Sequence, residues 1–272
     1  MTARENLLNL TPDDAEARLG AVMAELGQPG YRVGQVIRRL WQMPARSFAE
    51  MTELPSALRV ALDERFELPR LELATSQLST DGTRKFLFRL RDGEAIETVA
   101  IPDGNRITLC ISSQAGCALR CAFCATGAMG FSRNLEIFEI AGQVREMRLL
   151  DEPVGVTNIV FMGMGEPLMN WKAVSPTLTL LNDPRALGQL ARECGAFVNL
   201  IPLHPGGSQG FVPTPANEIS RFARLLRDRG VEVAVRKSRG MDIAAACGQL
   251  RVERMGRRPP RTADQHGDVQ VA

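Results

Sequence analysis

No apolar run in the 272-residue sequence is long enough to cross a membrane, because a transmembrane helix needs about 20 such residues. The N-terminus has no apolar core of the signal-peptide kind and carries acidic residues early. Lysine occurs only at Lys85, Lys172 and Lys237, so arginine supplies nearly all of the 33 basic residues, and the net charge is only +2. Because the net charge is small, it gives no indication of a nucleic-acid partner. We expect a cytoplasmic protein that does not contact a membrane.

A disulfide framework of the exported type is also missing. Three of the six cysteines, Cys117, Cys121 and Cys124, crowd one loop, and the others lie apart. In a reducing compartment, clustered thiols usually bind a metal or take part in catalysis. Three thiolates suit either a structural zinc site with Cys110 as fourth ligand or a [4Fe–4S] cluster with one iron left open for a non-protein ligand. The spacing favours the cluster, and zinc remains the alternative.

Residues 1–69 are predicted to form a small helical module. Thr11 is a candidate N-cap, Pro12 suits the first helical position, and two acids follow at the positive end of the helix dipole. Further helices are predicted over 31–42 and 55–66. Some of their basic residues are candidates for phosphate contacts, although a solvated helix face is the simpler explanation of each: Arg32, Arg38, Arg39 and Arg59.

In residues 70–105 the helical pattern gives way to partial alternation of apolar and polar residues, which predicts a short antiparallel β segment. Three runs with partial alternation follow one another, and Asp92-Gly93 lies between the second and third. Asp-Gly between strand-like runs is a strong hairpin signal. We therefore expect a β-hairpin region that leads into the next domain.

From residue 106 onward, apolar β-branched runs alternate with helical patterns, which is typical of a parallel sheet covered by helices. The candidate strands are 107–113, 156–163, 196–202 and 231–236, and the helices between them are 134–150, 171–181 and 217–230. About four strands are too few for a closed barrel of about eight, so an open α/β sheet is expected over 106–250. Residues 251–272 lose this periodicity and predict a mobile basic tail.

The cysteine loop and the segment Met164-Gly165-Glu166-Pro167 together resemble the radical S-adenosylmethionine (SAM) superfamily. Within it, "GCALRCAFC", "MGMGEPL", "VNLIP" and "RKSRGMDIAAACGQL" resemble the RlmN/Cfr group of RNA methyltransferases. The resemblance implies a radical-SAM-type βα barrel, a [4Fe–4S] cluster on Cys117, Cys121 and Cys124, and SAM held through its amino group by Gly165 and Glu166. It also implies 23S rRNA and tRNA as substrates, an RNA-binding role for the helical module, and an electron donor such as flavodoxin.

The same resemblance assigns candidate catalytic residues. An adenine C2 carbon is not a nucleophile, and the family solves this problem with a methyl group carried on a cysteine, whose position matches Cys247. Cys110 matches the second cysteine, which releases the RNA by forming a disulfide with the first, and Glu97 matches the proton acceptor. Without the family, Cys110 and Cys247 would be buried small side chains and Glu97 an exposed strand residue. Methylation at C8 of adenine is the same-family alternative.

The resemblance breaks near residues 189–190, where several βα units of the family are missing. With them go the serine-rich strand end and the "SLHA"-like segment that hold SAM, and His204 stands where family members have a SAM-contacting asparagine. We therefore expect a shortened, partial βα barrel. Either the sheet closes around fewer strands, or the chain is a remnant that carries the cluster or binds RNA without catalysis, through a natural deletion or a faulty gene model.

Overall fold

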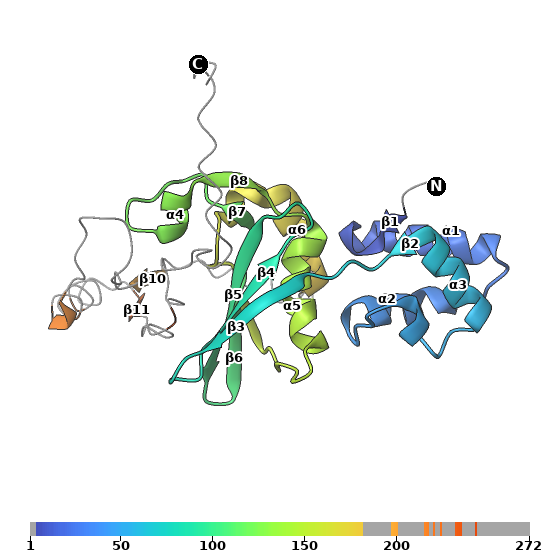
Figure 1. Ribbon diagram of the computed structural model, residues 1–272, viewed down its shortest axis with the longest axis horizontal. Coiled ribbons are helices and arrows are strands. Elements are labelled where there is room, and N and C mark those ends of the chain that lie inside the picture. Colours follow the sequence, from blue (N-terminus) through green and yellow to red (C-terminus); the bar gives the residue numbers. More distant parts are fainter. Residues whose placement is uncertain are drawn as a thin grey trace, which may run out of the picture.

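The computed structural model of the chain describes residues 4–181, 197–200, 215–217, 220, 224, 232–235 and 243 (Figure 1). Within these residues no helix combines the length and the apolar character needed to cross a membrane. The elements in chain order are β1 Glu5–Asn6, η1 Leu7–Asn9, α1 Pro12–Glu25, α2 Tyr31–Trp41, η2 Phe48–Glu50, α3 Ser56–Arg65, β2 Phe66–Glu67, β3 Glu72–Leu78, β4 Arg84–Arg89, β5 Ala95–Asp103, β6 Arg106–Cys110, β7 Gln114–Gly116, α4 Ala125–Met129, β8 Phe131–Asn134, α5 Ile137–Leu149, β9 Asn158–Val160, η3 Pro167–Asn170, α6 Trp171–Leu181, β10 Phe197–Leu200 and β11 Glu232–Val235.

The N-terminal helices form as the sequence predicts. α1 begins at Pro12, and the Thr11 hydroxyl accepts a hydrogen bond from the Asp14 N–H at 3.2 Å, so the predicted N-cap is confirmed. Leu19 and Met23, four residues apart on one face of α1, are buried. The helical pattern therefore sets both the start of the helix and the face that it buries.

Three of the arginines considered for phosphate contacts stabilise the module itself. The guanidinium groups of Arg32, Arg39 and Arg59 donate to backbone carbonyls of Glu53, Glu50 and Ala49, at 3.0, 3.1 and 2.6 Å. These carbonyls lie in or next to the short η2 segment, whose backbone groups have few partners of their own. Charged donors satisfy such carbonyls better than neutral ones.

The central sheet has five strands in the order β3-β4-β5-β6-β9. β3 to β6 pair antiparallel, as the hairpin signal at Asp92-Gly93 predicts, and β6 pairs parallel with β9. The sheet thus continues across the boundary at residue 105 that we expected between the hairpin region and the α/β region. β10 and β11 also pair parallel, but in a separate two-stranded sheet. The mixed α/β class is confirmed, and the shortened open barrel stays a prediction.

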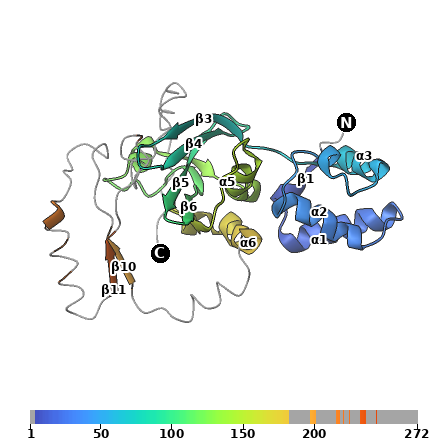
Figure 2. The same cartoon turned by 90° about the horizontal axis from the view of Figure 1, so that it is seen from below.

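One face of this sheet packs on α5. The Thr98 hydroxyl donates to the Gln143 side-chain oxygen of α5 at 2.7 Å, so the residues of β5 in phase with Thr98 face that helix. Phe86 lies opposite Thr98 and shares this face. Figure 1 and Figure 2 show α5 and α6 between the sheet and the N-terminal helices. The alternate residues, among them Glu97, lie on the other face.

Arginines of α5 hold the N-terminal helices against the sheet domain. Arg145, which is 2% exposed, donates to the backbone carbonyls of Leu40 and Ala45. Arg148 donates to the carbonyls of Trp41 and Gln42 at 2.9 and 2.8 Å. Leu40 and Trp41 lie in the last turn of α2, and Gln42 and Ala45 follow it, at the end of the helix where acceptors are left unpaired and positive charge is favoured. Burial lowers the pKa of Arg145 to about 10, so the group is still protonated at neutral pH.

Arg145→Met should therefore destabilise the protein by about 2–4 kcal/mol, since two buried carbonyls lose a charged donor. The exposed Arg148 makes contacts of the same kind, and Arg148→Met should cost less than about 1 kcal/mol. Urea unfolding of both variants measures the difference. Equal losses would contradict the argument that burial of Arg145 decides the strength of this attachment.

Candidate active site

The carboxyl ends of β6 and β9 lie side by side, and the segments that follow them stay paired. The Ile111 N–H donates to the Val160 carbonyl at 2.9 Å, and the Gly163 N–H donates to the Ile111 carbonyl at 3.1 Å. One residue pair further on, the Ser113 N–H donates to the Met164 carbonyl at 2.8 Å. The parallel ladder therefore continues past the strand ends, which is the place where parallel α/β sheets build their sites.

The cysteine loop, residues 117–130, is closed at its base by β7 and β8. These strands pair antiparallel, and the Cys117 N–H donates to the Gly130 carbonyl at 2.9 Å. Gly116 has φ +76°, and a Cβ atom there would collide with the Gly130 carbonyl oxygen. Only glycine permits this backbone conformation and this close approach together. The entry and exit of the loop are thus fixed next to each other.

The three loop cysteines are reduced thiols in the structure, with Cys117 buried and Cys121 and Cys124 half-buried. The Cys124 N–H donates to the Cys121 carbonyl at 3.0 Å, so these two residues share a tight turn. Within the described residues, no three His, Cys, Asp or Glu side chains converge as a single-ion site would require. Three thiols on one clamped loop are the kind of ligand set that an iron–sulfur cluster takes.

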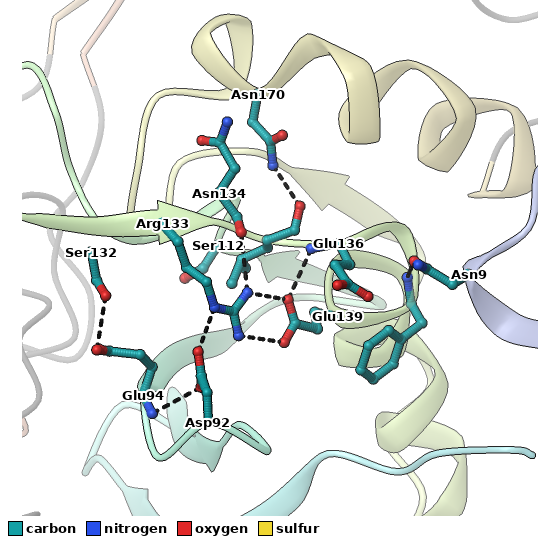
Figure 3. A network of polar contacts seen from close by, with 12 residues as sticks. Asn9, Asp92, Glu94, Ser112, Ser132, Arg133, Asn134, Glu136, Glu139 and Asn170 are labelled. Carbon is teal, nitrogen blue, oxygen red and sulfur yellow. Dashed lines mark hydrogen bonds and ion pairs between the residues drawn. The ribbon is translucent and has the colours of Figure 1, made fainter. Parts of the chain in front are cut away.

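An arginine on β8 attaches the exit of the cysteine loop to two other elements (Figure 3). Arg133 pairs with Asp92 in the β4–β5 turn at 2.5 Å and with both oxygens of Glu139 at 2.7 Å. Glu139 also accepts the Glu136 N–H at 2.9 Å as part of the capping box of α5. Arg133 lowers the pKa of Asp92 by hydrogen-bonding its charged carboxylate. Hairpin, helix and loop are therefore held together at one point.

The segment after β9 packs tightly against β7. Gly165 has φ +95°, and a Cβ atom there would lie 2.7 Å from the Gln114 backbone nitrogen. The Glu166 N–H donates to the Gln114 side-chain oxygen at 3.0 Å, and one Glu166 carboxylate oxygen accepts the Leu168 N–H at 3.1 Å. Glu166 is half-buried, and its backbone lies next to the base of the cysteine loop through the contact with Gln114.

Glu97 is buried, which excludes the exposed strand position that we considered for it. It is 4% exposed, and its carboxylate lies 3.1 Å from the ammonium of Lys85, which is 8% exposed. The Glu97 carbonyl accepts the Ser112 hydroxyl at 2.6 Å, and its N–H donates to the Met164 sulfur at 3.4 Å. The backbone of Glu97 is thus tied to both segments that continue β6 and β9.

Cys110 lies on the same sheet face as Glu97. It pairs with Val99, which also lies opposite Lys85, and directly opposed residues share a face. Glu97 is two residues from Val99 in β5 and therefore faces the same way. Cys110 is 6% exposed, so a buried position is confirmed, and its catalytic role stays a prediction.

The structure brings most of the predicted site residues into one neighbourhood. The cysteine loop, Glu166, Glu97 and Cys110 all lie on or directly beyond the sheet strands β5, β6 and β9. Cys247 and His204 lie outside the described residues. Sequence reasoning missed Lys85, Ser112, Gln114 and Arg133. A lysine in a strand of a protein with three lysines was the one available signal, and the other three are ordinary residue types without a motif.

Two family models match the chain. The one described as the N-terminal domain of ribosomal RNA large subunit methyltransferase covers residues 5–68, and the radical SAM superfamily covers residues 111–205. Among solved structures, a radical SAM methyltransferase from Sphaerobacter thermophilus is similar, with a TM-score of 0.74 and 30% identity. That match covers 91% of this chain and 99% of the other.

Curated relatives of the chain are also named as RNA methyltransferases. The chain is 52% identical to a probable dual-specificity RNA methyltransferase RlmN of Gemmatimonas aurantiaca, over 100% of both chains. It is 33% identical to the dual-specificity RNA methyltransferase RlmN of Alkalilimnicola ehrlichii, over 97% of this chain and 98% of the relative. The first alignment has 360 positions and this chain 272 residues, so at least 88 positions of the alignment have no residue here.

The Lys85–Glu97 pair predicts a strong non-additive effect on stability. Lys85→Met should destabilise the protein by about 3–5 kcal/mol, because it leaves a buried carboxylate without its counter-ion. Replacing both residues by methionine should recover most of this loss, since a buried ion pair is often exchangeable for apolar groups. Urea unfolding of the single and double variants gives the coupling energy, and additive losses would show that the pair is not coupled.

The Asp92–Arg133 pair predicts a pH dependence. The pKa of Asp92 is lower in the folded protein than in the unfolded chain. The contribution of Asp92 to stability is therefore complete above its unfolded-state pKa of about 4, and it is lost as the pH falls through its folded-state pKa. Wild type should therefore exceed Asp92→Asn in stability at pH 6, and the difference should shrink towards pH 3. Chemical unfolding at several pH values measures it. A difference that stays constant over this range would contradict the assignment.

Proposed function

The chain belongs to the RlmN family of radical SAM RNA methyltransferases, and we propose that it transfers a methyl group from SAM to C2 of an adenine in 23S rRNA, with tRNA as a second substrate. The observation that carries this proposal is the convergence of the cysteine loop, Glu166 and Glu97 at the carboxyl ends of β6 and β9. The proposal is supported by the backbone of Glu166, which bonds the Gln114 side chain at the base of the cysteine loop, and by the backbone of Glu97, which bonds Ser112 and Met164 in the segments that continue β6 and β9.

The described residues suit two bound groups. Cys117, Cys121 and Cys124 would hold a [4Fe–4S] cluster, and Gly165 and Glu166 would hold the amino group of SAM. Together these groups supply the radical chemistry that a non-nucleophilic adenine carbon requires. The chain's own contribution is to fix the two binding segments next to each other, which the continued β6–β9 ladder supports.

Three residues are proposed to act on the methyl group and the base. Cys247 carries the methyl group, and Cys110 releases the product by forming a disulfide with Cys247. Glu97 accepts the proton that adenine loses. The buried position of Glu97, on the same sheet face as Cys110, supports this role.

The proposed domains are an RNA-binding helical module over 1–69, the hairpin region 70–105, a shortened radical SAM domain over 106–250 as an open partial barrel, and a basic tail over 251–272. The match of residues 5–68 to the methyltransferase N-terminal domain supports the first of these. His204 is proposed as a SAM contact. An electron donor such as flavodoxin and a cytoplasmic location complete the proposal.

The missing alignment positions favour one alternative, a remnant that holds the cluster or RNA but has lost part of the SAM pocket. A chain of this kind would keep the thiols of the cysteine loop and bind no SAM. Methylation at adenine C8 is the alternative within the same chemistry.

Reconstitution without oxygen decides among these readings. The protein should take up about four irons per chain, and with SAM and a low-potential reductant it should release 5′-deoxyadenosine. Cys121→Ala should lose both iron and product. Mass spectrometry of the RNA then locates the methyl group at C2 or C8. An intact cluster with no bound SAM and no product would establish the remnant instead.

A further inference from the structure

Gln114 completes the paired segments beyond β6 and β9 with its side chain. The two segments pair through backbone groups and through the Ser112 hydroxyl, which accepts the Met164 N–H at 2.9 Å, and the Met164 carbonyl accepts the N–H groups of both Ser113 and Gln114. Two residues further along, the Glu166 N–H pairs with the Gln114 side-chain oxygen at 3.0 Å. A side chain therefore takes the place of a backbone carbonyl at the point where Glu166 leaves the ladder.

The other end of the same amide points to the cysteine loop. The Gln114 side-chain nitrogen donates to the Asn134 side-chain oxygen at 2.8 Å, and the two residues lie directly opposite each other on β7 and β8. β7 leads into the cysteine loop and β8 leads out of it. Gln114 is 1% exposed, and its two hydrogen-bond partners are the exposed Asn134 and the half-buried Glu166. One buried amide thus connects the base of the loop to the backbone of Glu166.

Few side chains can make this connection. Glutamine offers one acceptor and two donors at the end of a three-bond stem, and both ends are in use. The close approach of Gly165 to Gln114 leaves no room for a bulkier or branched residue. Without the amide, the half-buried Glu166 N–H would lose its hydrogen-bond partner, and so would the side-chain oxygen of the exposed Asn134; the cost falls mainly on the Glu166 N–H.

We propose that Gln114 is the positioning residue that fixes Glu166 relative to the cysteine loop, and so sets where the amino group of SAM is held relative to the cluster. This inference rests on the proposed function. Gln114 does not touch the reacting atoms, and it acts through Glu166 and through the base of the loop. Because Glu166 would hold the amino-acid end of SAM, loss of Gln114 should selectively weaken the binding of that end.

The test compares ligand binding to the reconstituted protein by equilibrium dialysis. Gln114→Met keeps the length of the side chain and removes both hydrogen bonds, and it should weaken SAM binding about tenfold or more. Gln114→Glu keeps the acceptor for the Glu166 N–H and loses only the donor to Asn134, so it should weaken SAM binding less than Gln114→Met does. 5′-Methylthioadenosine, which lacks the amino and carboxyl groups, should bind Gln114→Met as it binds wild type.

Thr177→Val is the control, because the Thr177 hydroxyl is buried in α6 and bonds the Ala173 carbonyl of its own helix. Iron content and thermal stability are measured for every variant, and the iron content of Gln114→Met should equal that of wild type. Unchanged SAM affinity in Gln114→Met, an equal loss for 5′-methylthioadenosine, or loss of iron would each overturn the positioning role alone. Failure of wild type to bind SAM would overturn the proposed function together with it.

Discussion

Parallel pairing of β6 with β9 is the constraint on which the candidate site depends, because it joins two segments that are some 50 residues apart in the sequence. The pairing carries on through Ile111, Ser113 and Met164 after the strands have ended. The cysteine loop leaves from one of these segments and Glu166 from the other. Backbone hydrogen bonds in a ladder admit little relative movement, so the distance between the two binding segments is set by the fold and not by the loops.

Buried polar groups then attach this centre to its surroundings. Ser112 bonds the backbones of Glu97 and Met164, and Gln143 of α5 bonds the Ser112 backbone through both ends of its amide. Arg133 connects the exit of the cysteine loop to the β4–β5 turn and to α5. Each of these groups would be unfavourable alone in the interior, and each is satisfied by several partners. The region around the site is therefore rigid through its polar contacts as well as its apolar packing.

The same helix that supports the site also holds the N-terminal module. α5 covers one face of the sheet, contributes Gln143 to the centre, and directs Arg145 and Arg148 to the end of α2. A module proposed to bind RNA is thus attached to the element that lies behind the proposed catalytic face. Contacts from this one helix hold the module, which suits the proposed presentation of one RNA base to the site.

The sequence by itself determined the local features. The Thr11 cap, the Asp92-Gly93 hairpin turn, the helices of the first module and the spacing of the three loop cysteines all depend on residues close together in the chain. Their conformational preferences act without the rest of the protein, and the motifs were specific enough to indicate the family. Strand identity was also predictable, because apolar β-branched runs mark buried strands wherever they occur.

Only the tertiary structure decided which side chains meet. Lys85 reaches Glu97 through the register of β4 on β5, Gln114 reaches Glu166 across 52 residues, and Arg145 reaches Leu40 across 105. Arg32, Arg39 and Arg59 were candidates for phosphate contacts, with a solvated helix face as the simpler explanation, and the structure shows them bonded to the backbone of their own module. Polar partners of this kind depend on strand register and helix packing, and a single sequence records neither, because any glutamine, serine or arginine can satisfy many different neighbours.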